Sequence, residues 1–246
     1  MSSKSGTLTG VEESAVKILK RAIELEGAAN YQPALVCYQE GIDLLLDVLK
    51  GCKDASKRKH FREKVEEYMT RAEQVKDAVQ KLKESGKYHE QMKIEENSTG
   101  FGYSKVFGPY VDEYITEVHV EDAYIRSFHQ INNFVRFCEM LIMRCKNVTN
   151  IHLTTTEDSN ANQQKDGLHS IAQSLLPYGI TLRVEYSTTL HDREITFSNG
   201  WIIKIGRGLD YFKKADKFSI GFHEMDLRKC HATTIDVFHK KHTRDR

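Results

Sequence analysis

The chain has 246 residues, enough for one large domain or two domains of ordinary size. Hydrophobic residues make up 39% and charged residues 29%, and the formal net charge is +1, a balance typical of a soluble globular protein. A charge so close to zero gives no global attraction to nucleic acid or membranes, so any such attraction must come from a local patch.

Targeting signals and disulfides are not expected. The N-terminal MSSKSGTLTG has neither the apolar run of a signal peptide nor the arginine-rich pattern of a transit peptide, and no segment approaches the roughly 20 apolar residues that span a bilayer. The five cysteines are scattered and form no Cys-x-x-Cys. We therefore expect reduced thiols in a cytoplasmic protein that carries no cofactor.

The first part of the chain is expected to form two helices joined by a short turn. Thr9 and Glu12 have capping-box spacing, so the first helix is predicted to begin at Thr9 and residues 1–8 to be disordered. Pro33 suits the first turn of a second helix, which runs to about Lys50 and is apolar on two faces, as expected for a helix packed between two neighbours. The two apolar stripes are Ala34, Tyr38, Gly41, Leu45 and Val48, and Leu35, Ile42, Leu46 and Leu49.

The segment Phe61–Leu82 predicts a third helix with a narrow apolar seam, because apolar residues recur in steps of four and three. Met69 lies off this seam. From residue types alone it is either a loose edge of the core or one wall of a groove for another helix. Together the three helices predict an all-α bundle over residues 9–85. A tetratricopeptide-type hairpin is the alternative, but no 34-residue repeat supports it.

Two motifs in this bundle resemble the microtubule-interacting and trafficking (MIT) domain. They are Asn30-Tyr-Gln-Pro-Ala-Leu-Val-Cys-Tyr-Gln-Glu-Gly-Ile and Glu67-Tyr-Met-Thr-Arg-Ala-Glu-Gln-Val-Lys76. In that family a groove between helices two and three binds amphipathic C-terminal helices of ESCRT-III subunits (charged multivesicular body protein tails). The resemblance implies that Met69 is the apolar anchor and that Glu73 pairs with an incoming arginine. The full set expected to bind a tail is Val65, Met69, Ala72, Glu73, Leu46 and Leu49.

Residues 86–100 are predicted to be a linker, with a middle part that can continue as helix. From Phe101 the pattern changes to strands alternating with helices, which predicts an α/β domain over residues 101–246. Strands are expected near residues 114–120, 148–154, 180–186, 193–197 and 201–205, and helices near 125–145 and 161–176.

The stretch His191-Asp-Arg-Glu-Ile-Thr-Phe-Ser198 is chemically suggestive. Taken alone, His191 and Arg193 on one side of an extended strand are usually solvated surface groups. With its surroundings, however, the stretch resembles the phospholipase-D-like domain joined to the C-terminus of an MIT domain in one family, and the whole chain is identified as a member of that family. The sequence thus predicts an all-α three-helix MIT bundle followed by an α/β phospholipase-D-like domain.

This motif departs from that of the active superfamily, which uses His-x-Lys-x4-Asp, usually in two copies. His191 is present, but Arg193 replaces the Lys, Ser198 replaces the Asp, and no second copy is found. Losing the acid that orients the histidine is severe for catalysis, whereas arginine can still bind phosphate. We therefore expect no catalytic residues, only the remnant His191 and Arg193. Because a single-copy member commonly pairs with another chain, the resemblance implies a homodimer through this domain.

Basic residues are dense in the last third of the chain. Each Lys or Arg near an anionic membrane can contribute about 1 kcal/mol, although such a run is most often a solvated surface. The resemblance implies binding to acidic phospholipids, including phosphoinositides, and the near-neutral net charge argues against nucleic acid. Candidate phospholipid-binding residues are Arg193, Arg207, Lys213, Lys214 and Lys217. A zinc site from Cys230, His231, His239 and His242 fits by spacing alone, and no metal is expected.

Two functions follow from these features. The first is a non-enzymatic adaptor that binds ESCRT-III tails and acidic membrane as a dimer and acts in cytokinesis, at abscission in the midbody, with peripheral recruitment to late endosomal membranes. The alternative is a phosphodiesterase or phospholipase targeted by its MIT domain, which requires turnover dependent on His191. The missing Asp and the missing second copy of the motif favour the adaptor.

Overall fold

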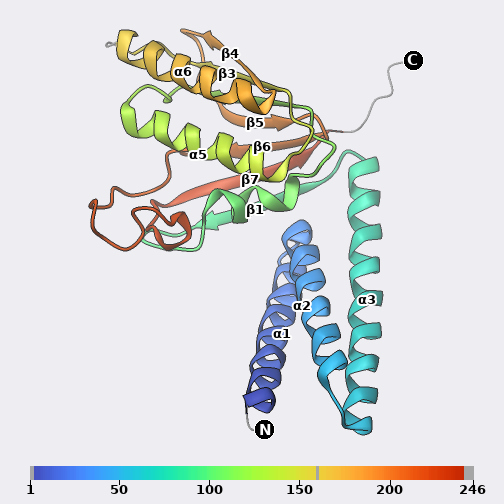
Figure 1. The fold of residues 1–246 in the computed structure, drawn as a ribbon. Coiled ribbons are helices and arrows are strands. Elements are labelled where there is room, and N and C mark those ends of the chain that lie inside the picture. Colours follow the sequence, from blue (N-terminus) through green and yellow to red (C-terminus); the bar gives the residue numbers. More distant parts are fainter. Residues whose placement is uncertain (1–2, 159–160, 241–246) are drawn as a thin grey trace. The chain divides into compact units, whose positions relative to one another are not determined.

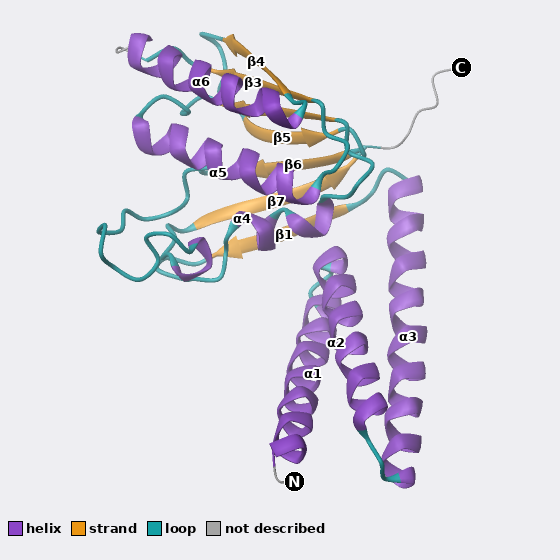
Figure 2. Cartoon of the chain, viewed as in Figure 1, coloured by secondary structure: helices purple, strands orange, loops and turns teal. Residues whose placement is uncertain are grey.

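The computed structural model describes residues 3–158 and 161–240 and divides the chain into two compact units, residues 1–90 and 91–246 (Figures 1 and 2). The first unit is helical and the second is a sheet with helices, as the sequence predicts. Within the described residues, no helix combines the length and the apolar character that a membrane span requires.

The first unit contains three helices, α1 (Ser3–Gly27), α2 (Tyr31–Gly51) and α3 (Ala55–Glu84). Helix α2 packs against both α1 and α3, which confirms that it is the middle helix. Its buried residues are those of the first predicted stripe: Ala34, Tyr38, Gly41, Leu45 and Val48. Gly41 lets α1 approach closely, because a Cβ at this position would stand 2.6 Å from the side chain of Leu19.

Helix α1 starts earlier than expected. It begins at Ser3 rather than Thr9, so residues 3–8 are helical and the prediction of a disordered segment fails for them. The Ser14 hydroxyl donates to the Gly10 carbonyl four residues back, as it does inside a helix. No proline interrupts residues 3–8, and capping-box spacing alone does not stop a helix from extending further.

Helix α3 also starts before the predicted segment. The Asp54 side chain caps it by accepting from the backbone N–H groups of Ser56 (2.8 Å) and Lys57 (3.0 Å). The predicted seam is confirmed in its most buried members, Phe61, Val65, Val75 and Val79.

One carboxylate joins all three helices. Glu26 of α1 accepts hydrogen bonds from the Tyr38 hydroxyl of α2 (2.6 Å) and from Arg71 Nε of α3 (2.8 Å). Burial alone would raise the pKa of Glu26, but these hydrogen bonds and the Arg71 charge outweigh burial and hold that pKa below its ordinary value.

The second unit is built on a seven-stranded mixed sheet with the order β1-β7-β6-β5-β2-β3-β4. The parallel part joins β2, β3 and β4, and antiparallel pairs join β2 to β5, β5 to β6, and β6 to β7. The strands are β1 (His89–Ile94), β2 (Glu117–Asp122), β3 (Asn150–Thr155), β4 (Thr181–Tyr186), β5 (Arg193–Phe197), β6 (Trp201–Ile205) and β7 (Thr233–His239). The helices are α4 (Tyr103–Val106), α5 (Phe128–Arg144) and α6 (Ala161–Leu175), with short 3-10 turns at Gly108–Tyr110, Leu176–Tyr178 and Met225–Leu227.

Helices α5 and α6 lie on the same face of this sheet (Figure 1). Alternate strand residues such as Val118, Ile151 and Ile203 are fully buried beneath them. The other face, which we name the open face, carries polar residues that are exposed or half-exposed. On β2 and β3 these are Glu117, His119, Glu121, Asn150, His152 and Thr154.

Residues 86–100 do not form the expected linker, nor does their middle part continue as helix, because residues 89–94 form strand β1 at the sheet edge beside β7. Tyr88, Glu90 and Ile94 are buried and alternate with exposed neighbours, which is the period of a strand. The side chain of Glu90 occupies a buried position of the strand. Because an acidic residue stands where an apolar one is expected, the sequence shows no alternation of apolar and polar residues here. Strand β7 was likewise not predicted.

All five cysteines are free. Cys138, Cys145 and Cys230 are buried, and burial raises their pKa to about 12, about 11 and about 11, respectively. These thiols are therefore protonated at neutral pH and unreactive while the fold is closed.

Candidate functional site

A groove of about 560 Å³ lies between α2 and α3. Its apolar lining comes from Leu35, Ile42, Met69, Ala72 and Val79, and its charged lining from Asp43, Glu73, Lys76 and Lys83. An elongated apolar floor with charges of both signs at its rim suits the apolar face of an amphipathic helix.

Met69 is the exposed apolar residue of this groove. Its side chain is 48% exposed, next to the half-buried Ala72 and the exposed Glu73. An unbranched thioether adapts to different apolar partners at little cost, and an exposed carboxylate can accept a charge-assisted hydrogen bond from an arginine.

The end of the sheet where β2 finishes and β5 begins holds Arg193, the arginine of the His-x-Arg motif. Its guanidinium carbon lies 4.2 Å from the centre of the Tyr124 ring, and Nη1 donates to the Gly206 carbonyl. The Nε atom is buried and has no hydrogen-bond partner among the described residues. The Arg193 guanidinium therefore stacks on a side chain of the same chain and donates its hydrogen bond to the backbone of the same chain.

Asp122 lies opposite Arg193 in the β2–β5 register and is buried, with 3% exposure. Its carboxylate accepts from the backbone N–H groups of Tyr124 (2.9 Å) and Leu209 (3.1 Å). Burial raises the pKa of Asp122, and Asp210 adds to the rise, while the two N–H donors and Arg193 act against it.

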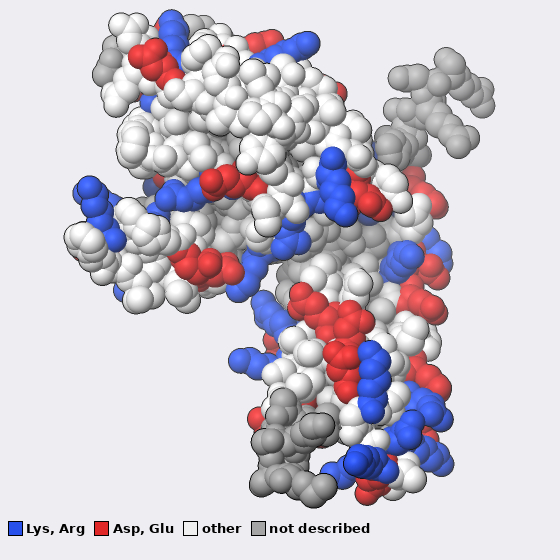
Figure 3. All heavy atoms as spheres, in the orientation of Figure 1, with Lys and Arg blue, Asp and Glu red and all other residues white. Residues whose placement is uncertain are grey.

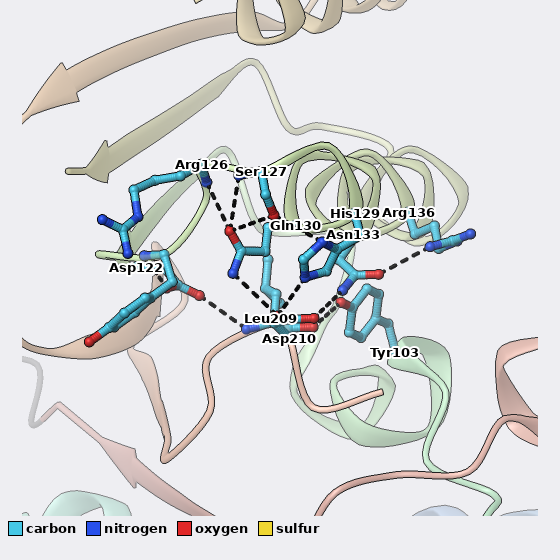
Figure 4. A network of polar contacts seen from close by, with 11 residues as sticks. Tyr103, Asp122, Arg126, Ser127, His129, Gln130, Asn133, Arg136, Leu209 and Asp210 are labelled. Carbon is cyan, nitrogen blue, oxygen red and sulfur yellow. Dashed lines mark hydrogen bonds and ion pairs between the residues drawn. The ribbon is translucent and has the colours of Figure 1, made fainter. Parts of the chain in front are cut away.

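A second carboxylate, Asp210, is held by the start of α5 (Figure 4). Its carboxylate lies 3.2 Å from His129 Nε2. It accepts hydrogen bonds from Gln130 Nε2 (3.3 Å) and Asn133 Nδ2 (3.0 Å). A negative charge near a helix N-terminus is favourable, so the network pins the loop after β6 onto α5.

No vacant space separates these groups. The region enclosed by Asp122, Arg193, Gly208 and Leu209 leaves no room for a water molecule. The space around Asp122 and Arg193 is therefore filled by the chain's own atoms.

A larger hollow of about 740 Å³ lies between α5 and residues 223–226. Its charged lining has both signs, from Arg136, Arg144, Glu139, Glu224 and Asp226. Cations and carboxylates neutralise each other there, so it offers no single-sign surface to a phosphate or a metal ion.

Comparison with known proteins decides the family. Residues 12–77 match the model of the MIT (microtubule interacting and transport) domain, and residues 100–239 match that of the phospholipase D-like domain at the C-terminus of MIT. MIT domain-containing protein 1 from Mus musculus is 56% identical over 234 residues, which cover 94% of each chain. The chain belongs to this MIT–phospholipase-D-like family. The predicted fold class is thereby confirmed.

Solved structures are similar as well, and we describe one of them. It is the phospholipase D family member Nuc from Salmonella typhimurium, at 12% identity and a TM-score of 0.33, covering 63% of this chain and 86% of that chain.

Within the MIT groove, the predicted tail-binding residues divide into two groups. Met69, Ala72 and Glu73 line the groove. Val65 lies in the core at 6% exposure, and Leu46 and Leu49 are half-buried further along α2 and are not among the lining residues. Leu35 and Ile42, from the same predicted stripe as Leu46 and Leu49, provide the α2 wall instead.

In the phospholipase-D-like domain, the motif residues do not meet. His191 is exposed in the loop before β5, whereas Ser198 lies at the opposite end of that strand. The Ser198 hydroxyl accepts from the backbone N–H groups of Thr116 (2.9 Å) and Glu117 (3.3 Å). A serine in place of the expected acid therefore binds backbone far from His191.

The predicted phospholipid-binding residues also differ in their surroundings. Lys213 pairs with Glu96 and donates to Asn97 (2.9 Å), and Arg193 stacks on Tyr124. Arg207, Lys214 and Lys217 are exposed. Only these last three present their cations to solvent.

A long loop connects β6 and β7 (Figure 1). It carries Lys214 and Lys217 and, close to them, two exposed apolar residues. Phe218 and Ile220 are 104% and 85% exposed. Arg228 holds the base of this loop, donating to the carbonyls of Gly221 (2.6 Å) and Phe222. Basic and acidic side chains both reach the surface in this region (Figure 3). Phe218 and Ile220 were not predicted as site residues, although two large apolar residues within a basic loop were the available signal.

The residues of the possible zinc site do not come together in the described part of the chain. Cys230 is buried, and the His239 ring packs edge-on against Trp201. Cys230, His231 and His239 form no group of converging ligand atoms, and His242 lies outside the described residues.

Proposed function

We propose that this protein is a non-enzymatic adaptor. Its MIT groove binds the C-terminal helices of ESCRT-III subunits, and its phospholipase-D-like domain forms a homodimer and binds acidic phospholipid membranes. The adaptor acts in cytokinesis, at abscission. It is cytoplasmic and is recruited to the midbody and, peripherally, to late endosomal membranes.

The groove between α2 and α3 is the observation that carries this proposal. Its apolar lining with Glu73 at the rim fits a helix that presents leucines and an arginine. Each leucine placed in such a groove stabilises the complex by about 1.5–3 kcal/mol before ordering costs, so a single site should have an affinity on the order of 1 μM.

Titration of labelled ESCRT-III C-terminal peptides tests the groove. Met69→Asp places a charge on the groove floor and should abolish binding without unfolding the bundle, because Met69 is 48% exposed. Val16→Asp is the matched control, since Val16 is 46% exposed on α1 outside the groove. Equal affinity of Met69→Asp and wild type would refute the groove assignment.

The loop between β6 and β7 supports membrane binding. Lys214 and Lys217 supply the attraction to anionic headgroups, and Phe218 and Ile220 can enter the interfacial layer. Because Arg228 and Gly221 hold the base of the loop, inserting the tip requires no unfolding of the sheet.

Co-sedimentation with phosphatidylserine-containing vesicles tests this role. Phe218→Ser combined with Ile220→Ser should weaken binding at least about tenfold, and Lys214→Gln combined with Lys217→Gln should reduce its salt dependence. Leu176→Ser, which changes an apolar residue 54% exposed beyond α6, is the control. Binding that survives both double variants would place the membrane contact elsewhere.

The absence of catalysis is part of the proposal. Arg193 is directed into Tyr124 and Gly206, and Ser198 lies far from His191. The carboxyl groups of Asp122 and Asp210 interact electrostatically at the same end of the sheet, and negative charge there opposes the binding of a phosphate. The single copy of the motif supports a homodimer, which light scattering during size-exclusion chromatography would detect. Two copies of each weak site would then bind with avidity.

A further inference from the structure

The open face of the sheet brings together two histidines and a glutamate, at a place separate from the groove and from Asp210. His119 of β2 and His152 of β3 are direct partners in the parallel register, and Glu117 lies two residues before His119 on the same face. The fold, not the sequence order, creates the cluster, since 33 residues separate the two histidines while strand pairing aligns them.

The side chains converge on one oxygen. Glu117 Oε1 lies 3.2 Å from His119 Nε2 and 2.8 Å from His152 Nε2. The two imidazole rings are stacked with their centres 4.5 Å apart and an interplanar angle of 9°. Among the described residues, this is the group whose carboxylate and imidazole atoms all lie within 4.8 Å of one another.

These spacings match the edge of a metal coordination polyhedron. Zinc binds imidazole nitrogen at about 2.0–2.1 Å and carboxylate oxygen at about 2.0–2.2 Å, so neighbouring ligand atoms of a tetrahedral site are roughly 3.3 Å apart. The two oxygen–nitrogen distances, 3.2 and 2.8 Å, lie near this value. Turning the two imidazole rings out of their parallel stack would direct both Nε2 atoms, together with the Glu117 oxygen, onto one ion.

The site has access to solvent. The side chains of His119, Glu117 and His152 are 51%, 42% and 23% exposed. A divalent ion can therefore enter without opening the sheet, and at least one coordination position would stay free for water or for a group from another molecule. In the register, Thr196 of β5 lies beside His119 and Arg183 of β4 beside His152.

We propose that Glu117, His119 and His152 bind a divalent transition-metal ion of the zinc class. Two imidazoles and one carboxylate are a donor set suited to Zn²⁺ and to neighbouring first-row metals, and unsuited to Ca²⁺ or Mg²⁺, which prefer oxygen ligands alone. This inference is independent of the adaptor function.

The experiment uses the full chain, stripped of metal with a chelator and kept in a thiol-free reductant. Zinc chloride is titrated by calorimetry, and the imidazole nitrogens are followed by NMR. The expected result is one zinc per chain, with the nitrogen shifts confined to the imidazole rings of His119 and His152. No zinc uptake by the wild type would overturn the proposal and leave the cluster as a hydrogen-bonded triad.

Variants assign the ligands. His119→Ala combined with His152→Ala should abolish uptake, and Glu117→Gln should weaken it at least about tenfold. His169→Ala is the matched control, an exposed histidine on α6, and should bind as the wild type does. Because all three ligands lie on an exposed face, circular dichroism should show the variants folded. Zinc uptake unchanged in the double variant would refute the assignment and place the ion on other histidines or on cysteines.

Discussion

Gly208 lies where the loop after β6 meets the buried carboxylate of Asp122. Its φ is +59°, in the left-handed region, and a Cβ added there would stand 2.0 Å from Asp122 Oδ2. The same approach allows the N–H of Leu209 to donate to that oxygen. A glycine is therefore required twice, for its backbone angle and for the space that it leaves.

Gly208→Ala is expected to lower the free energy of unfolding of the second unit by about 2 kcal/mol or more, since strain and a steric clash act together. Gly179→Ala is the control: its φ is +73°, but nothing lies within 4 Å of the added Cβ, so only strain of about 1 kcal/mol applies. Urea unfolding followed by fluorescence of the single tryptophan, the buried Trp201, measures both. Equal losses in the two variants would show that the contact with Asp122 has no energetic effect.

Glu26 makes the stability of the helical bundle depend on pH. Its pKa in the folded state lies below the ordinary value of 4.5, so the carboxylate stabilises the bundle at neutral pH. That contribution is complete above the pKa of the unfolded state and is lost as the pH falls through the folded pKa.

Glu26→Gln should therefore destabilise the bundle by roughly 1 kcal/mol at pH 7, and the difference from wild type should vanish in acid. Glu24→Gln should change the stability of the bundle little at any pH, because the Glu24–Arg21 ion pair is exposed to solvent. The two side chains are 66% and 62% exposed, respectively. Thermal unfolding followed by helical circular dichroism over a pH series provides the comparison. If Glu26→Gln stayed less stable than the wild type well below pH 4, the loss of stability would come from the changed shape of the side chain and not from its lost charge.

Strand β1 changes what residues 86–100 are expected to do. Ile94 is 2% exposed, whereas its neighbour Lys93 is exposed. A linker would tolerate a change at either position.

Ile94→Ala is predicted to cost about 2–4 kcal/mol, by loss of buried methyl groups and the cavity left behind, while Lys93→Ala should stay within about 0.5 kcal/mol of the wild type. Urea unfolding followed by the fluorescence of Trp201 measures the loss of stability in both variants. If both variants matched the wild type, β1 would contribute nothing to the second unit.

Helical periodicity and strand alternation in the sequence identified most of the elements, and the reasons for the exceptions are local. The stripe of α2 was predicted residue by residue, because one face of that helix packs against apolar neighbours throughout. Leu35 and Ile42 could not be preferred over Leu46 and Leu49 as the groove wall, since that choice depends on how far α2 and α3 are offset along each other. Strand β1 was missed because Glu90 occupies an inward position.

The second unit shows a similar limit. The motif His191, Arg193 and Ser198 could be read from the sequence, but its contacts could not. Two contacts in this unit join segments more than 65 residues apart in the sequence. Arg193 stacks on Tyr124, and Asp210 is held by the start of α5. The His119–His152 pair had no sequence signal at all, because only strand register creates it.

The molecule as a whole combines an MIT domain with a phospholipase-D-like domain, for which we propose that the His191 motif does not catalyse. Hydrolysis of a chromogenic phosphodiester should therefore be indistinguishable between wild type, His191→Ala and a no-protein blank. A matched assay with a known phospholipase D shows that the conditions support turnover. Activity in the wild type that disappears in His191→Ala would favour the enzyme over the adaptor.

The free thiols give each unit its own reporter of accessibility. Cys37 and Cys52 belong to the helical unit and are half-buried, whereas Cys138, Cys145 and Cys230 are sealed within the sheet unit. A thiol reagent added under native conditions should modify the first pair quickly and the other three only when the sheet unit opens. Mass spectrometry of the labelled chain over time would thus separate direct labelling of the helical unit from the opening rate of the sheet unit in one unmodified protein, including any slowing caused by a bound tail, vesicle or metal ion.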